Sequence, residues 1–280
     1  MRFGIIKNVG AALITEYGYL PFKTLGFDIS IEELISNEQT LLNKIEAASL
    51  QSDQFINYEK EQLCAPLQKP GKIVAIGLNY IDHASESKME LPKHPLVFTK
   101  FNSSITGPFD PINIPSQITS KVDYEVELAV VIGRKAKNVS KENALDYVFG
   151  YTIINDLSAR DIQFDDGQWV RGKSLDTFCP MGPFIVTKDE INDPQNLQLS
   201  CSINNNLLQN ASTKDMIFGV ADLISILSHS FTFEPGDIIS TGTPSGVGFI
   251  RKPPVFLKDN DTLTTEISHI GKLINKVKVL

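Results

Sequence analysis

The stretch from Val122 to Gly133 constrains the fold of this 280-residue chain more than any other. Its second half, residues 128–132 (LAVVI), is an uninterrupted apolar run. A short apolar run without polar alternation is typical of a strand that is buried on both faces. We therefore expect a central strand over residues 125–132.

Acidic residues stand at the entrance to this strand. Side chains two residues apart in a strand point to the same face, so Glu125 and Glu127 should lie side by side. Buried carboxylates repel each other and are costly to desolvate unless positive charge lies between them. A divalent cation would supply that charge, whereas an exposed strand end would keep both acids in water. The pair alone leaves both interpretations open.

A third acid, Asp156, ends the next apolar stretch, residues 151–155. If the two strands pair, Asp156 completes a cluster of three carboxylates. Three oxygen ligands without a nearby His or Cys favour a hard ion, Mg²⁺ or Mn²⁺, with Ca²⁺ as a substitute. Mg²⁺ usually keeps several waters, which would leave positions open for a substrate.

From Lys72 onward the sequence predicts many short strands and few helices. The predicted strands cover residues 73–76, 96–99, 125–132, 149–155, 184–186, 197–203, 237–241, 263–267 and 273–279. One strong helix is predicted over residues 213–229, with Ser212 and Asp215 resembling a capping box. The pattern indicates an α+β, β-rich domain of mixed sheets rather than a regular strand–helix alternation.

The beginning of the chain differs in pattern, and we predict a small N-terminal α/β domain over residues 1–66 and a larger domain over residues 67–280. Short strands are expected at residues 3–6 and 11–14. Ser30 is placed to cap a helix, and a second helix is expected over residues 40–49.

Two segments outside the acidic cluster carry candidates for catalysis. His83 and Glu86, three residues apart, would share one face of a short helix, and a histidine oriented by a carboxylate is a standard general base. Lys173 follows the only tryptophan, Trp169, and could stabilise enolate charge beside the acidic cluster. Taken alone, each of these side chains also fits an exposed surface position.

The segment 240–248 (STGTPSGVG) is rich in glycine and hydroxyl groups. Glycine allows close backbone approach, and hydroxyl and N–H groups can hold a carboxylate. The glycine spacing matches neither a dinucleotide fingerprint nor a P-loop. A tight surface turn is the alternative interpretation.

Composition argues against several partners. A net charge of −7 disfavours a nucleic-acid partner. No apolar stretch approaches the roughly 18 residues needed to span a bilayer, and the first residues do not resemble a signal peptide. Three widely spaced cysteines fit no disulfide framework or zinc site. We therefore expect a cytoplasmic protein with neither nucleic-acid nor membrane partners.

Taken together, five motifs resemble the fumarylacetoacetate hydrolase family over roughly residues 69–280. They are GLNYxDHxxE (77–86), DYExELAVVIG (123–133), GYTxxNDxSARDxQ (150–163), RGKSxDTFCPxGP (171–183) and TGTPxGVG (241–248). The resemblance implies a mixed β-roll or β-sandwich domain, usually in a homodimer. A small N-terminal domain is typical of bacterial-type members of the family.

The resemblance also implies a role for each matched position. The implied metal ligands, for Mg²⁺ or Mn²⁺, are Glu125, Glu127 and Asp156. The implied catalytic residues are His83, Glu86 and Lys173. The implied substrate contacts are Asn79, Tyr80, Arg160, Gln163 and Thr243, with Thr243 holding the substrate carboxylate.

Three functions are compatible with these residues. The first hypothesis is metal-dependent hydrolysis of a C–C bond in 2,4-dioxo acids, acylpyruvate-like, fumarylpyruvate-like or sugar-derived, to pyruvate and a carboxylic acid. The second is decarboxylation or tautomerisation of oxaloacetate or a related dicarboxylate at the same metal site. The third, a non-catalytic metal-binding protein or scaffold, is disfavoured because every expected site residue is present.

Overall fold

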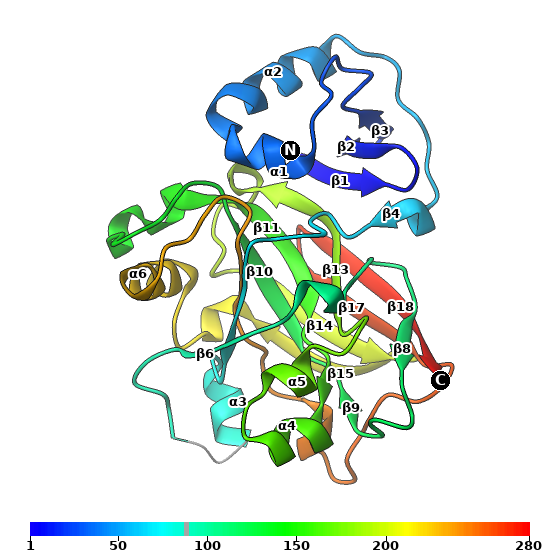
Figure 1. Ribbon diagram of the computed structural model, residues 1–280, viewed down its shortest axis with the longest axis vertical. Helices are drawn as coiled ribbons and strands as arrows, with labels where there is room; N and C mark the ends of the chain where they lie inside the picture. Colours follow the sequence, from blue (N-terminus) through cyan, green and yellow to red (C-terminus); the bar gives the residue numbers. More distant parts are fainter. Residues whose placement is uncertain (87–89) are drawn as a thin grey trace.

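The computed structural model describes residues 1–86 and 90–280 and shows a large and a small sheet packed together (Figure 1). The large sheet has the order β3 (Gly18–Pro21), β2 (Gly10–Thr15), β1 (Arg2–Ile6), β13 (Cys179–Thr187), β11 (Val148–Asn155), β10 (Val126–Ile132), β16 (Ile238–Ser240), β5 (Ile73–Gly77) and β6 (Leu96–Thr99), with β4 (Leu63–Cys64) beside β1 and β7 (Ile105–Thr106) beside β13. The smaller sheet has the order β15 (Asn206–Ser212), β14 (Gln198–Ile203), β17 (Thr262–Ile267), β18 (Gly271–Val279) and β8 (Ile112–Ile114).

Short elements complete the fold. Strands β9 (Val122–Asp123) and β12 (Ser158–Ala159) form a two-stranded pair. The α-helices are α1 (Ile31–Ser36), α2 (Glu38–Leu50), α3 (Ile81–Glu86), α4 (Arg160–Asp166), α5 (Val170–Lys173) and α6 (Val220–Ser230). No helix within residues 1–86 and 90–280 is both long and apolar enough to cross a membrane.

Strand β10 is buried along its whole length, as the apolar run predicts. Leu128, Val130 and Ile132 belong to the core between the two sheets. Ala129 and Val131 belong to a second core on the opposite face. Because successive side chains of a strand point to opposite faces, each core takes every second residue.

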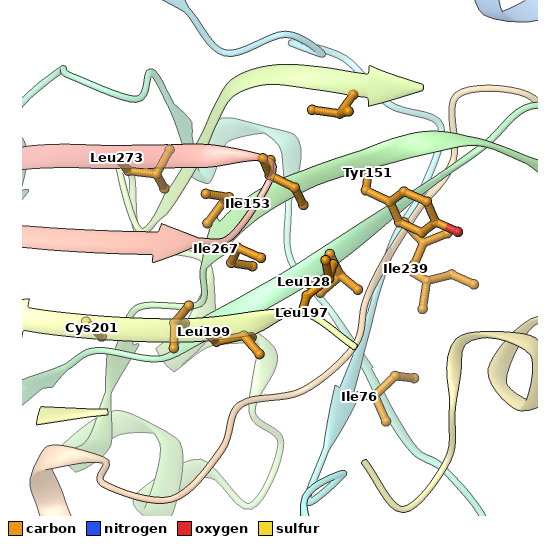
Figure 2. Close-up of a cluster of buried hydrophobic side chains, with 14 of the residues drawn as sticks. Ile76, Leu128, Tyr151, Ile153, Leu197, Leu199, Cys201, Ile239, Ile267 and Leu273 are labelled. Atoms are coloured by element: carbon orange, nitrogen blue, oxygen red, sulfur yellow. The ribbon is translucent and has the colours of Figure 1, made fainter. Parts of the chain in front are cut away.

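The first core fills the space between the large and the small sheet. Figure 2 shows Leu128 of β10 and Ile153 of β11 facing Leu199 of β14 and Ile267 of β17. These side chains are almost completely buried. Burial of this apolar surface supplies the main driving force that holds the two sheets together.

The N-terminal segment covers the second core. Helices α1 and α2 place Leu34, Ile35 and Ile45 in the same cluster as Val131. The predicted cap is present: the Ser30 side chain and Glu33 form a reciprocal capping box at the start of α1.

The N-terminal strands also extend the large sheet. Strand β1 is antiparallel to β13, with Phe3 opposite Ile185. In Figure 1 this segment, drawn in blue, sits at one end of the molecule. The predicted boundary between residues 66 and 67 stays a prediction, and the pairing of β1 with β13 places one shared sheet across it.

The predicted helix over residues 213–229 is wrong in its first half. Thr213–Asp215 forms a single 3-10 turn, in which Ser212 caps the N–H of Lys214, and α6 begins only at Val220. The Asn79 side chain bonds to both the N–H and the carbonyl of Phe218, which holds the intervening chain extended. Tertiary contacts therefore override the local helical pattern.

Each of the nine predicted strands overlaps an observed one. The largest difference is at β13, which runs over Cys179–Thr187 rather than residues 184–186. Pro180 and Pro183 concealed its first half, because proline is usually a sign against an interior strand position. The register between β11 and β13 shifts between the pairs Tyr151–Val186 and Ile153–Gly182, and Pro183 lies in this irregular stretch.

Candidate active site

Three carboxylates meet where β10 begins and β11 ends. Glu125, Glu127 and Asp156 each present one oxygen, and these atoms lie within 4.8 Å of one another. The strand register produces this arrangement: Val126 pairs with Asn155, and the N–H of Asp156 donates to the Glu125 carbonyl at 2.9 Å. Glu125 itself lies one residue before β10 rather than within it. The structure thus brings the three predicted acids together, fully buried.

Two buried lysines neutralise part of this charge. Lys173 Nζ lies 2.7 Å from a Glu125 oxygen and 2.6 Å from an Asp156 oxygen. Lys100 Nζ lies 2.6 Å from the other Asp156 oxygen and donates to the carbonyls of Leu157 and Lys173. Burial opposes the charge of Lys173, but attraction to Asp156 and Glu125 outweighs it and raises the Lys173 pKa above its ordinary value.

Lys100 was not among the predicted site residues. It immediately follows β6, an edge strand with mostly exposed side chains, so its local sequence resembles that of a surface lysine. Only the folded chain carries this position to Asp156, and the side chain is 2% exposed. No local signal could have identified it.

Arg160 forms the third positive contact to the cluster. Its Nη2 lies 2.5 Å from Glu125, its Nε 2.9 Å from Asp123, and its Nη1 donates to Gln163 Oε1 at 2.8 Å. Burial disfavours charge on Glu125, but Lys173 and then Arg160 outweigh it and lower the Glu125 pKa to about 2. Glu125 is therefore an anion held between two cations.

Glu127 has a different environment. One of its oxygens accepts hydrogen bonds from Ser240 Oγ at 2.5 Å and from the Gly242 N–H at 3.1 Å. Burial, followed by the charges of Asp156 and Glu125, raises the Glu127 pKa to about 8. Lys173, Lys100 and Arg160 pair with Glu125 and Asp156, and among the described residues no cation forms an ion pair with Glu127.

This donor set fits a divalent metal ion. Three carboxylate oxygens converge, they are hard ligands, and Glu127 is held in a position where its charge is disfavoured without further positive charge. Glu125, Glu127 and Asp156 are the side chains that would hold such an ion. Oxygen ligands of this kind suit Mg²⁺, Mn²⁺ or Ca²⁺.

His83 and Glu86 lie on α3 and line the same cavity as the carboxylates. His83 Nδ1 is buried and has no hydrogen-bond partner among the described residues, and it lies 4.0 Å from Glu86 Oε2. That oxygen instead accepts a hydrogen bond from the Gly246 N–H at 2.9 Å. Burial is the main cause that lowers the His83 pKa below its ordinary value, so the imidazole is neutral at pH 7.

Asp123 fixes the glycine-rich loop beside the site. Its carboxylate accepts hydrogen bonds from the N–H groups of Gly248 at 2.7 Å and Phe249 at 3.1 Å, in addition to its ion pair with Arg160. Gly248 is required here, because a Cβ at this position would lie 1.9 Å from the Val255 carbonyl oxygen. The 240–248 segment is therefore an ordered wall of the site rather than a surface turn.

The other predicted substrate contacts divide into two groups. Thr243 lines the cavity, where its Oγ1 donates to the Val126 carbonyl at 3.0 Å and accepts from Gln209 Nε2 at 2.9 Å. Arg160 and Gln163 also line the cavity. Their contacts with a substrate stay predictions.

Asn79 and Tyr80 lie outside the cavity lining formed by the described residues. The Asn79 amide holds Phe218 and the Thr241 carbonyl, so it joins α3 to neighbouring loops. The Tyr80 hydroxyl is buried without a hydrogen-bond partner among the described residues. In this structure both residues are buried next to the site and do not form part of the cavity surface.

The cavity has a volume of about 360 Å³. Its wall is aliphatic and aromatic except for the polar lining residues, which are His83, Glu86, Glu125, Glu127, Arg160, Gln163, Lys173 and Thr243. Elements α3, α4, α5 and β6 surround this region in the lower part of Figure 1. A concave, mainly apolar site with a few convergent polar groups is typical of a small-molecule active site.

Comparison with known proteins identifies the family. The sequence profile described as fumarylacetoacetate (FAA) hydrolase C-terminal matches residues 72–278. The chain is 43% identical over 278 residues to "Oxaloacetate tautomerase fahd2, mitochondrial" from Xenopus laevis, which covers 99% of this chain and 86% of that protein. That name places the relative in mitochondria, and the cytoplasmic location expected for this chain is not confirmed.

Solved structures of related enzymes have the same fold. The fumarylacetoacetate hydrolase from psychrophilic Exiguobacterium antarcticum covers 100% of both chains with a TM-score of 0.85 and 36% identity. The maleylpyruvate hydrolase from Sphingobium sp. SYK-6, in complex with manganese(II) ion and pyruvate, covers 100% of this chain and 99% of its own with a TM-score of 0.84 and 31% identity. The predicted fold class and family are confirmed: this chain is an enzyme of the fumarylacetoacetate hydrolase family.

Proposed function

We propose that the enzyme is a metal-dependent tautomerase that interconverts the enol and keto forms of oxaloacetate. This was part of the second hypothesis drawn from the sequence. The observation that carries it is the similarity to an oxaloacetate tautomerase over 99% of the chain. C–C bond hydrolysis, the first hypothesis, is the second candidate, because a maleylpyruvate hydrolase shares the fold at 31% identity.

The chemistry of tautomerisation matches the groups in the cavity. Glu125, Glu127 and Asp156 would hold Mg²⁺ or Mn²⁺, and the ion when bound supplies Lewis-acid polarisation of the substrate's 2-oxo group. The Lys173 ammonium, charged and buried beside the cluster, stabilises negative charge that develops on that oxygen as the enol forms or collapses.

One proton must leave C3 and one must arrive on O2 when the keto form becomes the enol, with the reverse on ketonisation. His83 lines the cavity as a neutral imidazole, which is the state needed to accept a proton from C3. The imidazolium formed in this way delivers the proton to O2, and ketonisation runs the transfer in reverse, from O2 through the imidazole to C3. A single base is sufficient for this exchange.

Hydrolysis requires a second catalytic residue on α3 in addition to His83. A base that activates water needs an orienting partner, and Glu86 is the candidate, yet Glu86 bonds to Gly246 and lies 4.0 Å from His83 Nδ1. This geometry supports the reaction that needs one base over the reaction that needs an assembled dyad.

The experiment that tests this proposal compares the two reactions on one preparation. Enol-enriched oxaloacetate is added to the enzyme with Mn²⁺, and ketonisation is followed through the loss of enol absorbance and through malate dehydrogenase with NADH. Pyruvate release from acetylpyruvate and from oxaloacetate is followed with lactate dehydrogenase. We expect rapid ketonisation with little pyruvate, whereas faster cleavage of acetylpyruvate would establish the hydrolase function instead.

The homodimer is a further proposal, supported by the family resemblance alone. Light scattering coupled to size-exclusion chromatography checks it, since a dimer of this 31.0 kDa chain doubles the measured mass.

A further inference from the structure

Four aromatic rings form a large part of the cavity wall. Phe98 and Trp169 form an edge-to-face pair with ring centroids 5.4 Å apart, and Phe164 and Phe249 form a second pair, also 5.4 Å apart. All four line the cavity, together with Ile76 and Leu78. Leu78 has a φ of 53°, a backbone conformation that bulky residues rarely adopt.

The aromatic wall begins directly beside the polar end of the cavity. Lys173 Nζ lies 5.0 Å from the centroid of the Phe98 ring, and the same Nζ contacts Glu125 and Asp156. A 2-oxo acid bound by its oxo-acid end at the cluster would therefore have the aromatic wall next to it in the same cavity.

Trp169 is held in place before any ligand binds. Its ring packs on the backbone of Gly77, where a Cβ would come within 2.6 Å of the ring. Phe98 supports the ring from the side. The indole is thus a preorganised surface, which lowers the entropy lost when a ligand packs on it.

Arg160 supplies further donors to the cavity. Its Nε, Nη1 and Nη2 bond to Asp123, Gln163 and Glu125, which leaves two of its five N–H groups without a partner among the described residues. A carboxylate substituent such as that of oxaloacetate would pair with these donors, whereas a planar apolar substituent would gain contact with the aromatic wall.

Resting on the proposed tautomerase function, we infer that the substrates of this enzyme include 2-oxo acids with a planar apolar substituent on C3, of the arylpyruvate class. The reaction is the same proton exchange: a C3–H bond breaks, an O2–H bond forms, and the double bond moves from C2–O2 to C2–C3. No further reactant is required. The volume of about 360 Å³ lies in the range of roughly 300–1,000 Å³ found for sites that enclose drug-sized ligands.

Binding tests this inference separately from turnover. Phenylpyruvate and pyruvate share the oxo-acid end and differ by the ring, so their Kd ratio isolates the aromatic wall. The measurement is isothermal titration calorimetry on the Mn²⁺-loaded enzyme. Since Trp169 is the only tryptophan, fluorescence quenching reports contact with the ring directly. We expect phenylpyruvate to bind at least about tenfold more tightly than pyruvate and to quench Trp169.

Variants of the wall complete the test. Trp169→Ala should remove most of the tenfold preference while changing the pyruvate Kd less, and Trp169→Phe should restore part of it. Phe101→Ala is the matched control, because Phe101 is 56% exposed and lies just beyond β6, outside the cavity lining. Equal affinity for the two ligands, or a preference that survives Trp169→Ala, would overturn the inference.

The two proposals fail in different ways. If enol oxaloacetate is not ketonised but phenylpyruvate still binds preferentially, the tautomerase function fails and the aromatic subsite stands. If oxaloacetate is ketonised and phenylpyruvate shows no preference, the aromatic subsite fails and the tautomerase function stands.

Discussion

The carboxylate cluster and the helix that carries His83 line one cavity but are held very differently. Glu125 and Asp156 are fixed by strand register, by two buried lysines and by Arg160. His83 sits on a six-residue helix, and its Nδ1 has no hydrogen-bond partner among the described residues. The half proposed to hold the metal ion is thus fixed by the sheets and by buried charge, whereas the proposed base lies on a short helix with few contacts to its imidazole.

The largest loss of activity should come from a substitution in the carboxylate cluster. Glu127→Gln keeps the shape of the side chain but removes a ligand charge, so we expect kcat/KM for enol oxaloacetate to fall by about 10³-fold or more and Mn²⁺ affinity to fall with it. The matched control is Glu266→Gln on the exposed face of β17. Calorimetric titration of Mn²⁺ and steady-state kinetics measure both quantities, and an unchanged rate at low Mn²⁺ would refute the ligand assignment.

Substitutions on α3 should distinguish the role of His83 from that of Glu86. His83→Ala removes the proposed base and should lower kcat for ketonisation by about 10²–10⁴-fold. Glu86→Gln should cost less than about tenfold, because Glu86 bonds to Gly246 and an amide oxygen can still accept that bond. Equal losses in the two variants would mean that Glu86 acts through His83 as a dyad.

Substitution of Lys100 should show how far the stability of the carboxylate cluster depends on buried positive charge. Lys100→Met leaves Asp156 with one cation fewer in a buried site, and breaking such a pair costs about 3–5 kcal/mol. We expect the free energy of unfolding in urea to fall by that amount. Lys276→Met, on exposed β-strand surface, should change it little. A loss below about 1 kcal/mol would show that Lys100 is not needed to balance the cluster.

The raised pKa of Glu127 also predicts a pH dependence for the stability of the metal-free enzyme. The folded-state pKa of Glu127 is raised from 4.5 to about 8, so between these values the folded state binds more protons than the unfolded state. Stability should therefore fall as pH rises through this window. Thermal unfolding in the presence of a chelator measures it, and the decline should be shallower in Glu127→Gln. Stability that declines equally in both proteins would assign the effect to other groups.

The sequence predicted the cluster well because strand geometry is local. The spacing of Glu125 and Glu127 and the acid that ends the next apolar strand suggested a cluster of three carboxylates, and the family resemblance selected this interpretation over an exposed strand end. Lys100 could not be found, because only the pairing of β6 with β5 at the sheet edge carries it to Asp156. The start of α6 was misplaced because the Asn79 side chain, distant in sequence, fixes Phe218.

The contact made by Glu86 is likewise set by tertiary structure. Residues 77–86 indicated a base and a carboxylate, but a sequence cannot say whether Glu86 bonds to His83 or to Gly246. That distinction is the one that separates water activation from simple proton exchange in this site.

The most direct test of the proposed metal-dependent function is the ketonisation rate of enol oxaloacetate measured as Mn²⁺ is titrated into chelator-treated enzyme. We expect a rate that rises from the uncatalysed value and saturates with the same midpoint as Mn²⁺ binding, with no equivalent rise in Glu127→Gln. A full rate in excess chelator, or a Mn²⁺ titration that is identical in the two proteins, would contradict it.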